Sequence, residues 1–306
     1  MRGFSPIRSL AVLALLVAAV AVGGAQELPR GTTPRGVVYS FLTETASADD
    51  SVNRGAFHDR LMGEFAQSDP RTFKGMFPRN AHLHIDSIPL LGGAEGDYSR
   101  AVAYVTVESG GQKENWYLYC AGDTIWRIEA LRRFPSPLQR SQIRQSLQEI
   151  DTSTAAYRIL HTDLQRMLLP DDSLRAILRL NRADAEKIAA PLARGRRWND
   201  FALRDVDFGK LEEYRELDDD IDGSDLIFYT LDRPALERLK RKVGIKRIER
   251  DPRYPDLILF VAGTLEKGSY GYINAPDSRS LPPVSRTEFI TLKPVADNWW
   301  FYKKIK

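Results

Sequence analysis

Cysteine is nearly absent from this chain: Cys120 is the only one among 306 residues. A single cysteine excludes any disulfide within the chain, so the fold must depend on packing alone. Side chains alternate across a strand, which in this segment places Cys120 on the same face as Trp116 and Leu118. We therefore interpret Cys120 as a small buried hydrophobic residue and not as a nucleophile or redox thiol.

The chain also lacks a large excess of charge of either sign. It holds 44 basic and 41 acidic side chains, and without Arg2 and Arg8 of the leader described below the count is 42 against 41. This balance argues against a general polyanion binder, and we predict no nucleic-acid partner. The local exception is the basic segment Arg238–Arg250, which is typical of the solvated face of a helix or strand. Contact with phosphates or acidic glycans is the alternative for that segment.

Long hydrophobic runs are missing apart from one of 13 residues, Leu10–Val22. Arg2 and Arg8 precede it and the small residues Gly23 to Ala25 follow it, so residues 1–25 are predicted to be a cleavable signal peptide. As a helix this run spans about 20 Å, which is too short for a hydrocarbon core of about 30 Å. We therefore predict an exported protein, periplasmic or secreted, with no transmembrane span.

Catalytic signatures are absent as well. The sequence has no G-x-S-x-G, H-E-x-x-H, P-loop or G-x-G-x-x-G pattern, and it holds only four histidines. An enzyme needs a nucleophile or an acid–base pair brought together. A site assembled from scattered residues leaves no motif, so an enzyme stays an alternative, but we favour a binding or interaction protein.

What the first third of the sequence does contain is a switch from helical to strand periodicity. Apolar residues recur at helical spacing and then alternate with polar ones, with glycine-containing turns between the alternating segments. Helices followed by an antiparallel meander predict an α+β unit. The predicted helices are Pro34–Thr45, Ala56–Phe65 and Arg71–Phe77, and the predicted strands are His82–Ile88, Arg100–Glu108, Asn115–Cys120 and Thr124–Leu131.

The rest of the chain again places helices before strands. A polar helix rich in Gln and Arg is predicted over 136–150, followed by helices over 155–168 and 173–190, the last ended by Pro191. The predicted strands are Leu226–Leu231, Leu257–Thr264, Gly268–Ile273, Glu288–Pro294 and Trp299–Lys304.

These patterns predict two α+β domains after the signal peptide. The first, at 33–134, combines helices with a curved antiparallel sheet. A connector helix at 135–152 leads to the second, at 153–306, in which helices precede a smaller antiparallel sheet.

Four short segments carry resemblances to known families. The helix start Thr33 to Val38 (TPRGVV) and the end of the meander, Gly122 to Ile128 (GDTIWRI), resemble a nuclear transport factor 2-like (NTF2-like, cystatin-like) domain. This resemblance covers residues 33–131 and implies a conical sheet with a concave mouth, where some relatives bind small apolar ligands or catalyse. Through Gly268 to Tyr272 (GSYGY) and Asp297 to Tyr302 (DNWWFY), the C-terminal half is similar to a family of uncharacterised exported bacterial proteins. That similarity implies fold and compartment, and no chemistry.

His82-x-His84-x-Asp86 is the sharpest candidate for a metal site. On a strand all three side chains project from one face, and two imidazoles with a carboxylate suit Zn²⁺ or Cu²⁺. The alternative is the solvated face of an edge strand. The segment Asp218 to Gly223 (DDDIDG) starts like a calcium loop but has no Glu at its twelfth position, which indicates an acidic surface turn. No cofactor is predicted apart from this divalent-metal alternative.

Aromatic residues are the candidate ligand-binding residues. Alternation on a strand sends one set of side chains to the core, and the other set can line the concave mouth of a cone. The alternative is packing between sheet and helix and between neighbouring strands. The four candidates are Trp116, Tyr117, Tyr119 and Trp126.

Together these features predict a non-enzymatic exported binding or interaction protein of the bacterial cell envelope. Its partner would be an unknown small ligand or an envelope protein. One alternative is a small hydrolase or isomerase on the same cone, with His82 or His84 beside Asp86 in a deep pocket. The other alternative is a metal-binding module that uses these three residues.

Overall fold

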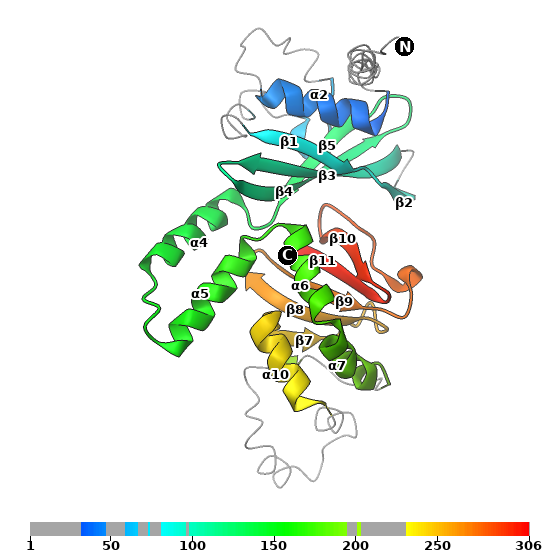
Figure 1. Cartoon of the computed structure of the whole chain (residues 1–306). Helices are drawn as coiled ribbons and strands as arrows, with labels where there is room; N and C mark the ends of the chain where they lie inside the picture. The colour runs from blue at the N-terminus through cyan, green and yellow to red at the C-terminus, as the bar shows by residue number, and fades with distance from the viewer. Residues whose placement is uncertain are drawn as a thin grey trace, which may run out of the picture.

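A computed structural model shows a mixed α+β protein with two antiparallel sheets (Figure 1). None of the helices in the described part of the chain is long and apolar enough to cross a membrane. Four of the predicted segments lie outside the described residues: the signal peptide, the acidic turn 218–223, the strand 226–231 except Leu231, and the helix 71–77 except Phe73. The structure describes residues 32–46, 59–66, 73, 81–95, 98–194, 201–202 and 231–305.

The N-terminal sheet has the strand order β1-β3-β4-β5, with β2 paired to β3 as well. All of these pairings are antiparallel, as the meander pattern predicts. The sequence pattern does not predict β2, because Gly92 and Gly93 lower the strand propensity of this segment. Its strand conformation depends on pairing with β3. The strands are β1 (His82–Ser87), β2 (Leu90–Glu95), β3 (Tyr98–Ser109), β4 (Gln112–Gly122) and β5 (Arg127–Arg133).

Helix α2 (Pro34–Ala46) covers one face of this sheet (Figure 1). Its Phe41 lies in one buried cluster with Trp116, Leu118 and Cys120 of β4. The predicted alternation is therefore confirmed, and Cys120 is a buried free thiol. Burial raises the pKa of Cys120 well above its usual range, so the thiol stays protonated.

The helix predicted over Ala56–Phe65 is wrong for the described residues 59–66. Only a 3-10 turn, η1 (Gly63–Phe65), forms there. Gly63 has a φ of 56°, a left-handed conformation that interrupts a helix. Leu61 instead forms a parallel bridge with Ile128 of β5, so this segment extends the sheet edge and adds nothing to the helical layer.

The C-terminal sheet has the strand order β10-β11-β9-β8-β7-β6, again antiparallel throughout. The first part of the basic segment Arg238–Arg250 belongs to helix α10 (Arg233–Lys242), which resolves the choice between helix and strand there. This helix begins where the Asp232 carboxylate accepts from the Ala235 N–H at 2.9 Å. The strands are β6 (Phe201–Ala202), β7 (Arg247–Glu249), β8 (Ile258–Leu265), β9 (Gly268–Asn274), β10 (Phe289–Ala296) and β11 (Trp299–Ile305).

The single helix predicted over 173–190 is wrong, since two helices, α6 (Asp171–Leu180) and α7 (Arg182–Arg194), meet at Asn181. The Asn181 side-chain amide donates to the carbonyl of Ile177 at 2.8 Å, which competes with continued helical bonding. Pro191 lies inside α7 and does not end it. A proline near the end of a helix removes one backbone hydrogen bond, and the packed helix tolerates that loss here.

The two sheets pack against each other, so both faces of the N-terminal sheet are covered. Tyr104, Tyr117 and Tyr119 of this sheet share one buried cluster with Leu174 of α6 and Phe301 of β11. The face opposite α2, which would be the concave mouth of an open cone, is therefore filled by the C-terminal half of the chain.

Helices α4 (Pro137–Glu149) and α5 (Ala155–Met167) lie side by side and project from the body of the molecule (Figure 1). Ser136 and Gln139 form a capping box at the start of α4, in which each side chain bonds the other residue's backbone N–H. The polar helix predicted over 136–150 therefore forms, within one residue at each end. It leads from β5 to the helices of the C-terminal half.

Candidate functional site

The tyrosines predicted to line a concave mouth point into the interface between the two sheets. The Tyr119 hydroxyl donates to the backbone carbonyls of Ser285 at 2.9 Å and Ile290 at 2.8 Å. The Tyr117 hydroxyl donates to Asp171 and lies 2.9 Å from each carboxylate oxygen. Both hydroxyls therefore bond to the C-terminal half of the chain at the place where a ligand was predicted.

Trp116 and Trp126 lie on the other face of the N-terminal sheet. Both are buried in the cluster that contains α2. The guanidinium carbon of Arg133 lies 4.4 Å from the Trp116 ring centroid, which is a cation–π contact. The structure therefore does not bring the four aromatic candidates together, because the sheet separates the two tryptophans from the two tyrosines.

Asp171, at the start of α6, is the centre of a buried polar cluster at the interface between the sheets. Lys293 and Lys303 each place Nζ 2.8 Å from its carboxylate, and the Asn115 side-chain oxygen accepts from the Asp171 N–H at 2.8 Å. Burial alone would raise the pKa of Asp171, but the two ammonium groups outweigh it and hold that pKa well below its ordinary value. Burial lowers the pKa of Lys303, and Asp171 offsets part of that shift. Because Asp171 is sealed from solvent, its carboxylate joins the sheets and is not open to a ligand.

His82, His84 and Asp86 lie on β1, an edge strand, and all three are exposed. His84 Nε2 is 3.8 Å from Asp86 Oδ1, and Asp86 accepts from the Thr106 hydroxyl at 2.9 Å. Among the residues that the structure describes, no group of three His, Cys, Asp or Glu side chains is placed to hold a metal ion. The structure thus brings His84 and Asp86 near each other without forming a three-ligand set or a deep pocket around them.

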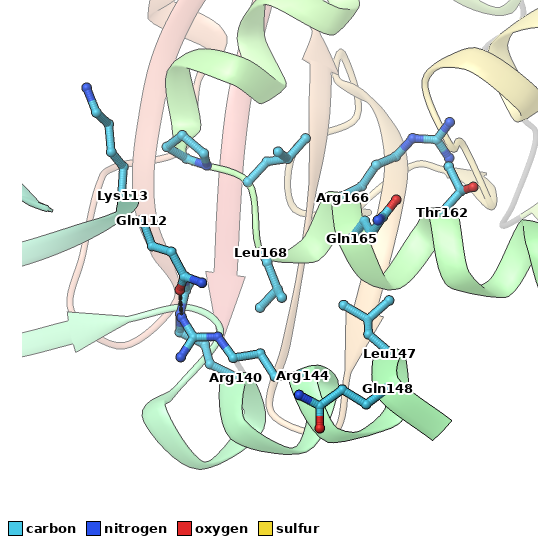
Figure 2. Close-up of a pocket in the computed structure, with 12 residues that line it drawn as sticks. Gln112, Lys113, Arg140, Arg144, Leu147, Gln148, Thr162, Gln165, Arg166 and Leu168 are labelled. Atoms are coloured by element: carbon cyan, nitrogen blue, oxygen red, sulfur yellow. Dashed lines mark hydrogen bonds between the residues drawn. The ribbon is translucent and has the colours of Figure 1, made fainter. Parts of the chain in front are cut away.

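A groove of about 640 Å³, the α4–α5 groove, lies between the two projecting helices (Figure 2). Its lining comes from the start of β4, from α4, from α5 and from the connection between α5 and α6. Leucines and a proline supply its apolar part, and all four charged residues of the lining are basic. The lining residues are Gln112, Lys113, Arg140, Arg144, Leu147, Gln148, Thr162, Gln165, Arg166, Leu168, Leu169 and Pro170.

Arg140 is the most buried of these four cations, with 8% of its side chain exposed. Its Nε lies 3.5 Å from Glu114 Oε2 but makes no hydrogen bond to any residue of the described chain. Burial lowers the pKa of Arg140, Glu114 raises it, and Arg144 lowers it further. Glu114 also acts on the nearby Arg133, so one carboxylate serves two guanidinium groups. The wall of the groove therefore carries positive charge that is only partly neutralised.

Arg144 is the cation most available to a ligand. Its guanidinium donates to the Gln112 side-chain oxygen (dashed line in Figure 2), and it has no carboxylate partner among the described residues. In contrast, Lys113 lies 3.4 Å from Glu108, and Arg166 donates to a carboxylate of α5 at 2.9 Å. An anion entering the groove would thus meet Arg144 without displacing an existing ion pair.

Sequence reasoning missed this groove because its basic residues are spread over 113–166 on separate elements. The one available signal is the richness of the helix over 136–150 in Gln and Arg, which the sequence analysis interprets as a polar connector between domains. Only the packing of α5 beside α4 places these side chains around a common space.

Comparison with known proteins finds no relative. No protein-family model matches the chain, and no curated protein or solved structure is significantly similar to it.

Proposed function

We propose that this chain is a non-enzymatic binding protein of the bacterial cell envelope, exported by residues 1–25, and that the α4–α5 groove binds an anionic amphiphile. The observation that carries the proposal is the lining of the groove, in which every charged residue is basic and the apolar part is leucine and proline. Ligand pockets are mostly apolar, and a few charged groups orient the ligand. A phosphate, sulfate or carboxylate would pair with Arg144, while an apolar body would lie against Leu147 and Leu168.

The geometry of α4 supports a head-group site at its basic face. Arg140 and Arg144 are four residues apart on this helix, and side chains with that spacing lie on one face. A guanidinium binds a carboxylate or phosphate through two parallel hydrogen bonds. Because burial lowers the pKa of Arg140, a nearby anion would stabilise its charged form. The groove volume of about 640 Å³ suits a small molecule, since such pockets measure roughly 300–1,000 Å³.

We also propose that residues 33–134 form an NTF2-like domain and residues 153–306 a second domain, with α4 as the connector. The packing of α2 on one face of a five-stranded antiparallel sheet supports this assignment. In this arrangement the second domain occupies the mouth of the cone. We therefore assign the ligand to the α4–α5 groove and not to the four aromatic residues of the sheet.

Isothermal titration calorimetry with octyl phosphate and octyl glucoside tests the proposal, since the two probes share an apolar tail and differ in charge. We expect octyl phosphate to bind at a single site and octyl glucoside to bind at least about tenfold more weakly. Arg144→Glu is expected to weaken octyl phosphate binding by about tenfold or more, because a charged hydrogen bond contributes about 1.5–3 kcal/mol.

The matched control is Arg279→Glu, which reverses the same charge at an exposed site on the 3-10 turn η3 (Ser278–Ser280), outside the groove. This control should bind octyl phosphate like the unaltered protein. Equal affinity for the two probes, no binding of octyl phosphate, or unchanged binding by Arg144→Glu would each refute the proposed ligand class.

A further inference from the structure

A second groove, of about 590 Å³, lies between α5 and α10, and we name it the α5–α10 groove. It is closed where α5 meets the end of α10, because Arg166 donates to the backbone carbonyls of Arg241 at 2.6 Å and Lys242 at 3.2 Å. From that end the two helices form its walls. The lining residues are Ala155, Arg158, Ile159, Thr162, Asp163, Arg166, Glu237, Lys240, Arg241, Ile245 and Lys246.

The first half of α5 exposes an unusual amount of apolar surface. Every residue from Ala155 to Leu160 is exposed, and Tyr157, Ile159 and Leu160 leave 50%, 63% and 45% of their surface open. Ile159 lines the groove, and Ile245 is buried at its base. Covering an exposed apolar side chain removes it from water, which stabilises a complex. Ala155 and Ile159, four residues apart, share the face of α5 that lines the groove, whereas Tyr157 and Leu160 share a different face of the helix.

The charge of the groove selects an acidic partner. Five of its seven charged lining residues are basic, and the two acidic ones already have partners. Asp163 pairs with Arg166 and Lys246, and Glu237 pairs with Lys240 at 2.8 Å. The last turn of α10 adds a third consecutive basic residue beside the groove. The surface next to the exposed isoleucine is therefore net positive although the whole chain is near neutral.

The walls of the groove favour a partner segment that is helical. A helix uses its own backbone groups internally, so an extended peptide would find no strand edge to pair with on α5 or α10. A helix in the groove satisfies its own backbone and needs only side-chain contacts. The lining residues of α5 run from Ala155 to Arg166, about 16 Å along the helix axis, which matches about three turns of a docked helix. A flat lipid surface could touch the projecting end of α5 but would not reach the base of a groove.

We propose that the α5–α10 groove docks an acidic amphipathic helix of a partner protein. The apolar face of that helix lies on Ile159 and Ala155, which are exposed and line the groove. Its carboxylates pair with Arg241 and share Lys240 with Glu237. This inference goes beyond the proposed function, which concerns a small ligand in the other groove. The residues changed in the test below line only the α5–α10 groove, so the two proposals fail independently.

Site-specific photocrosslinking in the source organism identifies what covers the groove. The full chain would carry p-benzoylphenylalanine in place of Ile159, and the control would carry it in place of Leu180, which is exposed at the end of α6 outside the groove. We expect position 159 to crosslink one protein, at a peptide that is acidic and has apolar residues at i, i+3 and i+4. The adduct should fall several-fold in the Lys240→Glu/Arg241→Glu double variant and be absent from position 180.

A synthetic peptide of the crosslinked segment then tests charge complementarity directly. The double variant should bind this peptide at least about tenfold more weakly, and a peptide with two glutamates changed to lysine should recover the loss. A circular dichroism spectrum and melting temperature like those of the unaltered protein would show that the double variant is folded. The proposal would be overturned if position 159 gave no adduct, adducts with lipid alone, or an adduct with a segment that is not acidic. It would also be overturned by equal adducts from position 180, or by unchanged peptide binding in the double variant.

Discussion

Asp171→Asn tests whether the buried cluster joins the two sheets. The substitution keeps the side-chain size and the backbone N–H that donates to Asn115, so the main change is the loss of charge beside Lys293 and Lys303. Removal of one partner from a buried ion pair costs about 3–5 kcal/mol, because the remaining charge stays buried without a counterion. For a chain of this size we expect the melting temperature to fall by roughly 6–20 °C.

The pH dependence of this variant follows from the pKa shifts. The folded-state pKa of Asp171 is lowered, so its stabilising contribution is complete above the ordinary Asp pKa of about 3.9 and is lost as the pH falls toward the folded value. The Asp171→Asn variant has no carboxylate at this position, so this loss of stability in acid does not occur in it. The folded-state pKa of Lys303 is lowered, so the unfolded state binds more protons and stability rises with pH up to about 10.4. Without the Asp171 carboxylate the pKa of Lys303 falls further. Lys303 of the variant then loses its proton at lower pH, so the variant should recover stability in mildly alkaline solution.

Urea and thermal unfolding followed by circular dichroism, in acidic, neutral and alkaline buffer, measure these effects. The control is Asp172→Asn, the same change at the next, exposed residue of α6, which should leave the unfolding free energy nearly unchanged. Adding Lys303→Met to Asp171→Asn should recover at least half of the loss, because it removes a buried unpaired charge. A loss below about 1 kcal/mol for Asp171→Asn, or no recovery in the double variant, would refute this account of the interface.

Three further predictions concern buried groups and one concerns export. Tyr119→Phe should destabilise the protein by about 1–3 kcal/mol in urea unfolding, because the Ile290 carbonyl that accepts from its hydroxyl stays buried. Gly271→Ala should lower the melting temperature clearly, since a Cβ there would lie 2.1 Å from the Phe260 carbonyl oxygen and would force β8 and β9 apart. Cys120 should resist Ellman's reagent in native protein even in alkaline buffer and react fully in denaturant, because burial raises its thiol pKa. N-terminal sequencing of protein from the source organism should begin near residue 26, and an intact residue 1 would contradict the predicted leader.

Local patterns in the sequence determined most of the elements. The period-two alternation around Cys120 predicted that Trp116, Leu118 and Cys120 share one face of the strand, and the structure places all three in the buried cluster that contains α2. The start of α4 depends on side chains within three residues of each other, so it too is visible in the sequence. The errors at Gly63 and Asn181 arise where one residue's backbone or side-chain bonding overrides a longer apolar period.

The tertiary structure alone decided what covers each face and where a ligand fits. Tyr117 meets a carboxylate 54 residues away, and Tyr119 meets carbonyls 166 and 171 residues away. A sequence period reports that a strand has two faces, but it carries no information on which distant element packs on the second face. The α4–α5 groove is hidden for the same reason, because basic residues that lie apart in the sequence surround one space only after the helices have packed.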